Sequence, residues 1–215
     1  MSAPCNVVVL ISGSGSNLQA LIDSLGDDSP VRICAVVSNR EDAYGLQRAK
    51  AAGIATQVVR HKDYADREAF DTALGDVIDA YQPELVVLAG FMRILTPGFV
   101  RRYQGRLLNI HPSLLPKYKG LDTHQRALAA GDTEHGCSVH FVTEELDGGP
   151  VALQASFAIA PGEEVGLLTD RVHSAEHMIY PLAVRWFAEG RLRLAEQGAM
   201  LDNVLLPATG YSLRT

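Results

Sequence analysis

Short apolar runs alternate with longer segments of helical period through the first half of the chain. The runs, rich in Val and Ile, predict strands at residues 6–11, 31–39, 54–59 and 85–90, and the longer segments predict helices at residues 17–25, 43–53 and 66–81. The runs are continuously apolar, as is typical of strands covered on both faces. Strand–helix–strand alternation favours parallel strands. The pattern therefore predicts an open α/β sheet, in which ligands bind beyond the carboxyl ends of the strands.

The second half of the chain changes character. Another short apolar run at 106–111 leads into a proline-bearing loop and a short helix at about 122–130. Two strand-like runs, 137–143 and 150–159, are joined by Glu-Glu-Leu-Asp-Gly-Gly, which favours a hairpin and hence a mixed sheet. A long helix at about 166–189 precedes a short strand-like tail. Because no repeat or low-complexity linker interrupts the pattern, we expect one domain over residues 1–215.

Composition narrows the class of protein. The 215 residues carry a formal net charge of −6, which argues against a surface devoted to nucleic acid, because phosphate backbones are held mainly by clustered Lys and Arg. The three cysteines have no paired spacing, so we expect neither a disulfide framework nor a Cys-rich zinc site, and a reducing cytoplasm fits best. The first apolar run is too short for a signal peptide and lacks a basic leader, and no stretch approaches the length of a membrane helix.

A glycine-rich turn, SGSGSNLQALI, follows the first predicted strand and opens a helix. Glycines let a backbone approach a ligand closely, and the free N–H groups of a helix N-terminus suit a phosphate. A tight turn in which Ser and Asn cap the helix explains the same residues. The turn lacks the Lys of a Walker loop, Leu18 stands at the third glycine of a GxGxxG pattern, and the second strand ends in Val-Ser-Asn. These departures leave a phosphate site without a dinucleotide.

Two polar side chains stand at the exit of the strand at 106–111. Asn109 and His111 occupy that exit in RLLNIHPSLLPKYKG, and two prolines follow within five residues. Taken singly, Asn109 satisfies a strand end, His111 fits a hydrogen-bonded core position, and Asp147 fits a turn before Gly. A strand exit in a parallel sheet and a loop of a neighbouring hairpin can both reach the same cleft, so the three residues are considered together. Together they fit acyl transfer to an amine, which needs a donor for the oxyanion of a tetrahedral intermediate and a group that moves a proton.

This interpretation of Asn109, His111 and Asp147 needs neither a nucleophilic side chain nor a metal ion. An adjacent carboxylate would fix the tautomer of His111, and no nucleophilic Ser or Cys is needed if the amine attacks directly. The spacing of His135 and His140 does not assemble a metal site, and His140 is interpreted as a strand side chain. We therefore expect chemistry without a metal.

Five stretches in order resemble the folate-dependent formyltransferases: VVLISGSGSNLQALID, VVLAGFMRILTP, LLNIHPSLLPKYKG, HGCSVHFVTEELDGGPV and EHMIYPLAVRWFAEGRL. The resemblance covers nearly the whole chain. It implies a three-layer, Rossmann-like α/β fold with a mostly parallel sheet and an antiparallel C-terminal part. It also implies 10-formyltetrahydrofolate as the formyl donor and phosphoribosylglycinamide as the amine acceptor, in purine biosynthesis. Neither a nucleic acid nor a membrane is an expected partner, and a homodimer is left open.

The resemblance also assigns roles by position. Asn109, His111 and Asp147 match the catalytic set of the family. Gly15, Ser16 and Asn17 match its loop for the ribonucleotide phosphate, and Glu176 matches an acidic residue that holds the ribose. The expected folate site comprises Asn109 and the residues Arg67, Met92, Arg93, Ile94, Leu95, Thr143, Glu144, Glu145, Leu146 and Asp147. Bacterial relatives often have Pro in place of Lys119 and His in place of Asp122, so Asp122 receives no role, and contact of Lys119 with an anionic ligand stays open.

Three rival functions are kept. A formyltetrahydrofolate hydrolase uses the same donor with water, but usually carries a regulatory domain ahead of the catalytic one. A methionyl-tRNA formyltransferase would carry a further C-terminal domain and a basic surface. A binding protein without turnover would not need Asn109, His111 and Asp147 together. We expect this chain, with its first strand near residue 6 and its end at Thr215, to be none of the three.

Overall fold

The structure is a computed structural model that describes residues 3–26 and 29–215. It divides into two compact units, and the division falls between Asn109 and Ile110, inside a strand. The expectation of one domain over residues 1–215 stays a prediction. Among the described residues, no helix has the length and apolar character needed to cross a membrane.

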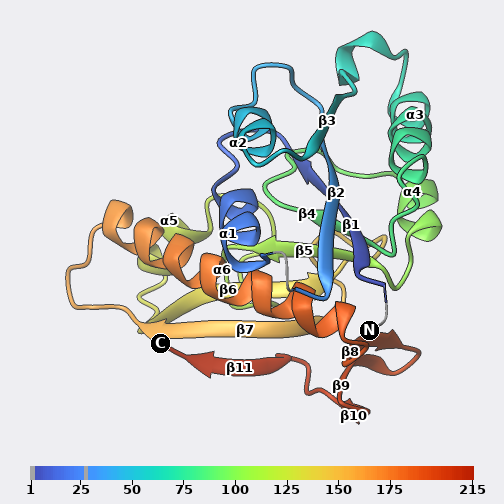
Figure 1. Ribbon diagram of the computed structural model, residues 1–215. Coiled ribbons are helices and arrows are strands. Elements are labelled where there is room, and N and C mark those ends of the chain that lie inside the picture. Colours follow the sequence, from blue (N-terminus) through green and yellow to red (C-terminus); the bar gives the residue numbers. More distant parts are fainter. Residues whose placement is uncertain (1–2, 27–28) are drawn as a thin grey trace. The chain divides into compact units, whose positions relative to one another are not determined.

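The first unit is built on parallel strands, as the sequence predicted. The strands lie in the order β5 (Leu107–His111), β4 (Leu85–Leu88), β1 (Cys5–Ile11), β2 (Val31–Ser38) and β3 (Ala55–Val58), and every pair in this series is parallel (Figure 1). The helices are α1 (Ser16–Ser24), α2 (Gly45–Ala51), α3 (Arg67–Asp79) and α4 (Pro97–Arg102), with the short helix η1 (His61–Asp63). The helix α4 and η1 were not predicted, because each is shorter than two turns and shows little periodicity.

Local chemistry sets the starts of two helices in this unit. The side chain of Asp66 accepts a hydrogen bond from the Ala69 N–H and caps α3. Thr96 caps α4 in the same way, and Pro97 at the first helical position has no N–H to leave unsatisfied. The helices α3 and α4 lie side by side (Figure 1). Every residue of β4 is buried, which explains its unbroken apolar run.

The second unit contains the predicted hairpin. The strands β6 (Glu134–Phe141) and β7 (Val151–Ala158) are antiparallel, and β11 (Tyr211–Arg214) pairs with β7 in parallel. The long helix α6 (Val165–Ala188) runs along β6 and β7, and α5 (Thr123–Ala129) contacts α6 (Figure 1). The fold is thus mixed α/β with a mostly parallel central sheet, as predicted.

The C-terminal tail is more elaborate than the short strand expected from the sequence. After α6, the strands β8 (Leu192–Ala195), β9 (Gly198–Leu201) and β10 (Val204–Leu205) form a small antiparallel sheet. Asp202 and Asn203 turn the chain between β9 and β10 with φ angles of 51° and 67°. Asn and Asp adopt this left-handed conformation more readily than other non-glycine residues, which permits the two-residue turn.

Candidate active site

The glycine-rich turn follows β1 and ends at the first residue of α1. Gly15 has a φ of 72°, in the left-handed region, and immediately precedes Ser16, where α1 begins. Asn17 is buried and Ser16 is partly exposed. The three residues expected to bind a phosphate are therefore consecutive at the amino end of a helix, a position at which backbone N–H groups commonly bind anions.

One backbone and one side-chain hydrogen bond hold this turn against α2. Gly13 O accepts a hydrogen bond of 3.0 Å from the Gly45 N–H, and Arg48 Nε donates to Ser14 O at 2.8 Å. A Cβ atom on Gly15 would lie 2.6 Å from the Cα atom of Gly45. Gly15 is thus required twice, by its φ angle and by the closeness of the neighbouring backbone.

The residues expected to line the folate pocket lie in two different loops. In the first unit, the Arg67 guanidinium donates to Ile94 O at 2.9 Å, so two of them are in contact. The side chains of Met92 and Ile94 are mostly exposed, at 68% and 62%. Arg93 lies over the ring of Phe70 at 5.6 Å. Large apolar side chains that stay exposed beside a cation offer a surface for a flat, partly anionic ligand.

The remaining folate-side residues form the loop between β6 and β7. Thr143, Glu144, Glu145 and Leu146 are all at least partly exposed. The loop closes on two glycines that leave room for neighbouring groups: a side chain at Gly149 would collide with Phe141 O, and one at Gly148 would collide with the Glu145 side chain. Asp147 precedes them with a φ of 47°. The backbone of Phe141 therefore leaves room only for glycine at position 149.

His111 and Asp147 come together in the second unit. His111 ends β5, and its Nδ1 atom lies 3.5 Å from Asp147 Oδ2. Both side chains are largely buried, at 7% and 9% exposure. The sequence predicted that a strand exit and a hairpin loop reach the same place, and this pair shows that they do. Asn109 stands two residues earlier on β5, and residues two apart on a strand share a face.

The hydrogen bonds of His111 assign its tautomer. Its Nε2 atom lies 2.8 Å from Tyr118 O, and a carbonyl oxygen only accepts, so Nε2 carries the hydrogen. In the neutral ring Nδ1 is then a lone pair that faces the Asp147 carboxylate. A proton taken up at Nδ1 would meet a negative charge. The hydrogen bond to Tyr118 O thus leaves Nδ1 as the ring nitrogen without a hydrogen, on the side of Asp147.

A second histidine faces Asp147 from β6. His140 Nε2 lies 3.8 Å from Asp147 Oδ1, and His140 Nδ1 lies 3.0 Å from Phe141 O. Burial lowers the pKa of His140 well below its ordinary value. The ring is a strand side chain, as the sequence suggested, but it also borders the carboxylate, which sequence reasoning missed. Its position on β6, one residue before Phe141 and close to the Asp147 loop, was the available signal.

Glu176 is buried on α6, with 4% exposure. Burial and then the Glu176 carboxylate raise the pKa of the Cys137 thiol, which places Glu176 near β6. A buried carboxylate needs a partner or a ligand. Its role in holding a ribose stays a prediction.

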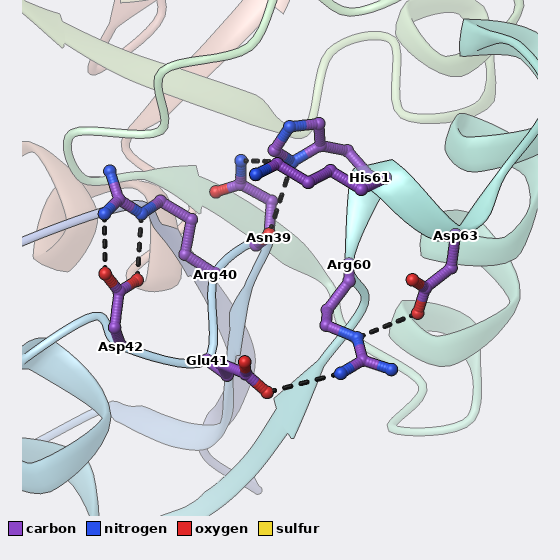
Figure 2. Close-up of a pocket in the computed structure, with 8 residues that line it drawn as sticks. Asn39, Arg40, Glu41, Asp42, Arg60, His61 and Asp63 are labelled. Atoms are coloured by element: carbon purple, nitrogen blue, oxygen red, sulfur yellow. Dashed lines mark hydrogen bonds and ion pairs between the residues drawn. The ribbon is translucent and has the colours of Figure 1, made fainter.

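A cavity of about 670 Å³ in the first unit contains none of the predicted site residues. Charged and polar side chains that follow β2 and β3 line it: Asn39, Arg40, Glu41, Asp42, Arg60, His61, Lys62 and Asp63. Figure 2 shows Arg40 paired with Asp42, and Arg60 placed between Glu41 and Asp63. Because these guanidinium groups already meet carboxylates, the cavity supplies no excess charge of either sign.

Ser12 forms hydrogen bonds both to Asn39, which lines this cavity, and to the backbone of Met92. Ser12 Oγ donates to Asn39 Oδ1 at 2.6 Å and accepts from the Met92 N–H at 2.8 Å. In the described part of the chain, no group of three or more His, Cys, Asp or Glu side chains is arranged to hold a metal ion.

The sequence and the fold agree with a known class of protein. The model of the formyl transferase family matches residues 5–184, and the chain belongs to this family.

Individual relatives are also similar over their full length. A phosphoribosylglycinamide formyltransferase of Escherichia coli (strain K12) is 57% identical, over 96% of this chain and 98% of the relative. One from Haemophilus influenzae is 50% identical over the same shares. The solved structure of the phosphoribosylglycinamide formyltransferase of Coxiella burnetii has a TM-score of 0.94 and 51% identity, and it covers 98% of this chain and 99% of that one.

Proposed function

We propose that this chain transfers the formyl group of 10-formyltetrahydrofolate to the amine of phosphoribosylglycinamide. The observation that carries the proposal is the buried His111–Asp147 pair at the end of β5, in a chain 57% identical to an enzyme named for this activity. The Gly15 turn at the start of α1 supports a phosphate-bearing acceptor. The exposed apolar side chains of Met92 and Ile94 support a flat donor.

The chemistry requires one bond to form and one to break. The amine nitrogen bonds to the formyl carbon, a tetrahedral intermediate forms, and the bond from that carbon to folate N10 breaks. One proton leaves the attacking amine, and one arrives on N10. His111 takes the proton at Nδ1, Asp147 stabilises the resulting imidazolium, and His111 returns a proton to the leaving nitrogen.

The oxyanion of the intermediate needs hydrogen-bond donors. The Asn109 amide, which shares a face of β5 with His111, is proposed as one donor, and the protonated Nδ1–H of His111 as another. Donors that are already oriented before the reaction stabilise the developing charge without reorganisation. Neither step calls for a metal ion or for a covalent enzyme intermediate.

The test is a spectroscopic assay of folate deformylation with and without phosphoribosylglycinamide. Release of deformylated folate only when the amine is present supports the transferase. Release at the same rate without the amine would identify a hydrolase, and folate binding without release would identify a binding protein. The rate should be unchanged in EDTA, and inhibition by EDTA would contradict the metal-free mechanism.

A further inference from the structure

Two backbone groups next to Lys119 contact the two members of the His111–Asp147 pair. Tyr118 O accepts the hydrogen bond from His111 Nε2 at 2.8 Å, and the Gly120 N–H donates to Asp147 Oδ2 at 2.9 Å. The first group is bonded directly to the Lys119 nitrogen, and the second directly to the Lys119 carbonyl carbon. The orientation of Lys119 therefore controls both contacts at once.

The backbone at this point does not hold its conformation without help. Tyr118 has a φ of 55° and Gly120 a φ of 79°, and neither lies in a helix or a strand. A non-glycine residue in this left-handed region is under strain of order 1 kcal/mol or more. Contacts with other groups must favour this conformation over relaxed alternatives, and one of them is Ser113 Oγ, which donates to Lys117 O at 2.6 Å.

The side chain of Lys119 supplies such a contact. Its Nζ lies 2.6 Å from Glu145 Oε1, in the loop that also carries Asp147. The Glu145 side chain occupies the space that a side chain at Gly148 would need. On the other side, the Arg126 guanidinium donates to Lys119 O at 2.7 Å. Lys119 is thus tied to the loop of the catalytic carboxylate by its side chain and to α5 by its carbonyl.

We propose that Lys119 is a positioning residue: its ion pair with Glu145 holds Tyr118 O on His111 Nε2 and the Gly120 N–H on Asp147. The first contact keeps Nδ1 of His111 as the basic nitrogen, and the second keeps the carboxylate opposite it. This inference rests on the proposed function, because it assigns Lys119 to the pair that moves the proton. It also gives Lys119 a partner within the chain in place of an anionic ligand.

The central experiment compares Lys119→Met with Lys117→Met. Lys117 is a matched control, because it lies two residues away and also pairs with one carboxylate, Asp132, at 2.9 Å. Tyr118 OH holds the same carboxylate at 2.8 Å, so the segment stays attached in the control. We expect kcat to fall about 10-fold or more in Lys119→Met, because misplacing reacting groups by about 1 Å costs up to roughly 100-fold. The KM values should change less than about twofold, and Lys117→Met should retain wild-type kcat.

A further readout separates positioning from other roles. The pH profile of kcat should change in Lys119→Met, because the hydrogen bond that Tyr118 O accepts from His111 and the one that the Gly120 N–H donates to Asp147 both loosen. Unchanged kcat and pH profile in Lys119→Met would overturn the proposal. A raised KM with unchanged kcat would overturn it too, because Lys119 would then bind substrate.

A measurement without turnover distinguishes failure of this proposal from failure of the proposed function. Long-range ¹H–¹⁵N NMR of the histidine rings, with His111 assigned by the His111→Asn variant, reports the tautomer directly. The wild type should show the Nε2–H form at His111, and Lys119→Met should show a mixture of tautomers. The same tautomer in both proteins would contradict the positioning role of Lys119, even if the wild type proved inactive in formyl transfer.

Discussion

Two loops that follow strands of this protein are held in place by different means. The turn after β1 is short, and it is held mainly by close backbone contacts of Gly13 and Gly15 with Gly45, with one hydrogen bond from the Arg48 side chain. The segment between β5 and α5 is longer, and side-chain groups of Ser113 and Lys119 hold it, with partners as far along the chain as Glu145.

The difference indicates how each loop responds to mutation. A turn whose glycines allow close backbone packing has no room for an added Cβ atom. Such an addition should first lower the stability of the protein. A segment held by ion pairs and hydrogen bonds is damaged by removing one group, and the damage appears first in the geometry of the residues it contacts. The predictions below test this contrast from the largest effect to the smallest.

Removing the imidazole that the long segment contacts should have the largest effect. His111→Ala is expected to lower turnover at least about 10²- to 10³-fold, which is the typical loss when one oxyanion donor is removed. Asn109→Ala should have an effect of the same order. Steady-state formyl transfer measures the loss, and near-ultraviolet circular dichroism checks that each variant is folded. Turnover close to that of the wild type would remove the substituted residue from the mechanism.

Adding one methyl group to the short turn should destabilise the protein. Gly15→Ala combines a left-handed φ with a Cβ atom 2.6 Å from Gly45 Cα, so we expect a loss of about 3 kcal/mol in urea unfolding. Gly53→Ala is the matched control, because Gly53 has a φ of 71° but open space around its Cβ position. It should lose only about 1 kcal/mol. Equal losses would mean that the contact with α2 does not hold the turn.

Acid should lower the stability of the protein at the contact between α5 and β6, which follow the long segment. His124 Nδ1 and His135 Nε2 are 3.1 Å apart, and His135 is buried. Burial, and then the neighbouring His124, lower the pKa of His135 from 6.5 to about 4. The unfolded chain therefore binds this proton at a higher pH than the folded chain, and acid favours unfolding.

The stability that neutral His135 contributes should be complete above pH 6.5 and fall progressively toward pH 4. At 1.36 kcal/mol per pKa unit, the loss is about 3 kcal/mol. In His135→Gln the free energy of unfolding should vary less with pH over this window, as measured by urea unfolding at several pH values. An unchanged slope would show that His135 is not the titrating group.

Features that depend on local sequence could be predicted, and features that depend on contacts between remote segments could not. The strands of the first unit, its helices α1, α2 and α3, the hairpin and the long helix α6 were predicted, because apolar periodicity over many residues is a local signal. The expected C-terminal strand proved to be four strands, since β10 has only two residues and little pattern of its own. Proximity of Asp147 to His111 followed from the expected topology.

Other features of the site are absent from any single stretch of sequence. The tautomer of His111 depends on the carbonyl of Tyr118, and the approach of His140 to Asp147 depends on how β6 and its loop fold back. The partner of Lys119 lies 26 residues away. Residue types and their spacing determined the fold class, the Gly15 turn and the candidate chemistry, because these depend on local conformational preferences and apolar burial. Only the tertiary structure decided which donor faces which acceptor, because hydrogen bonds and ion pairs depend on distances of a few ångströms between segments remote in the chain.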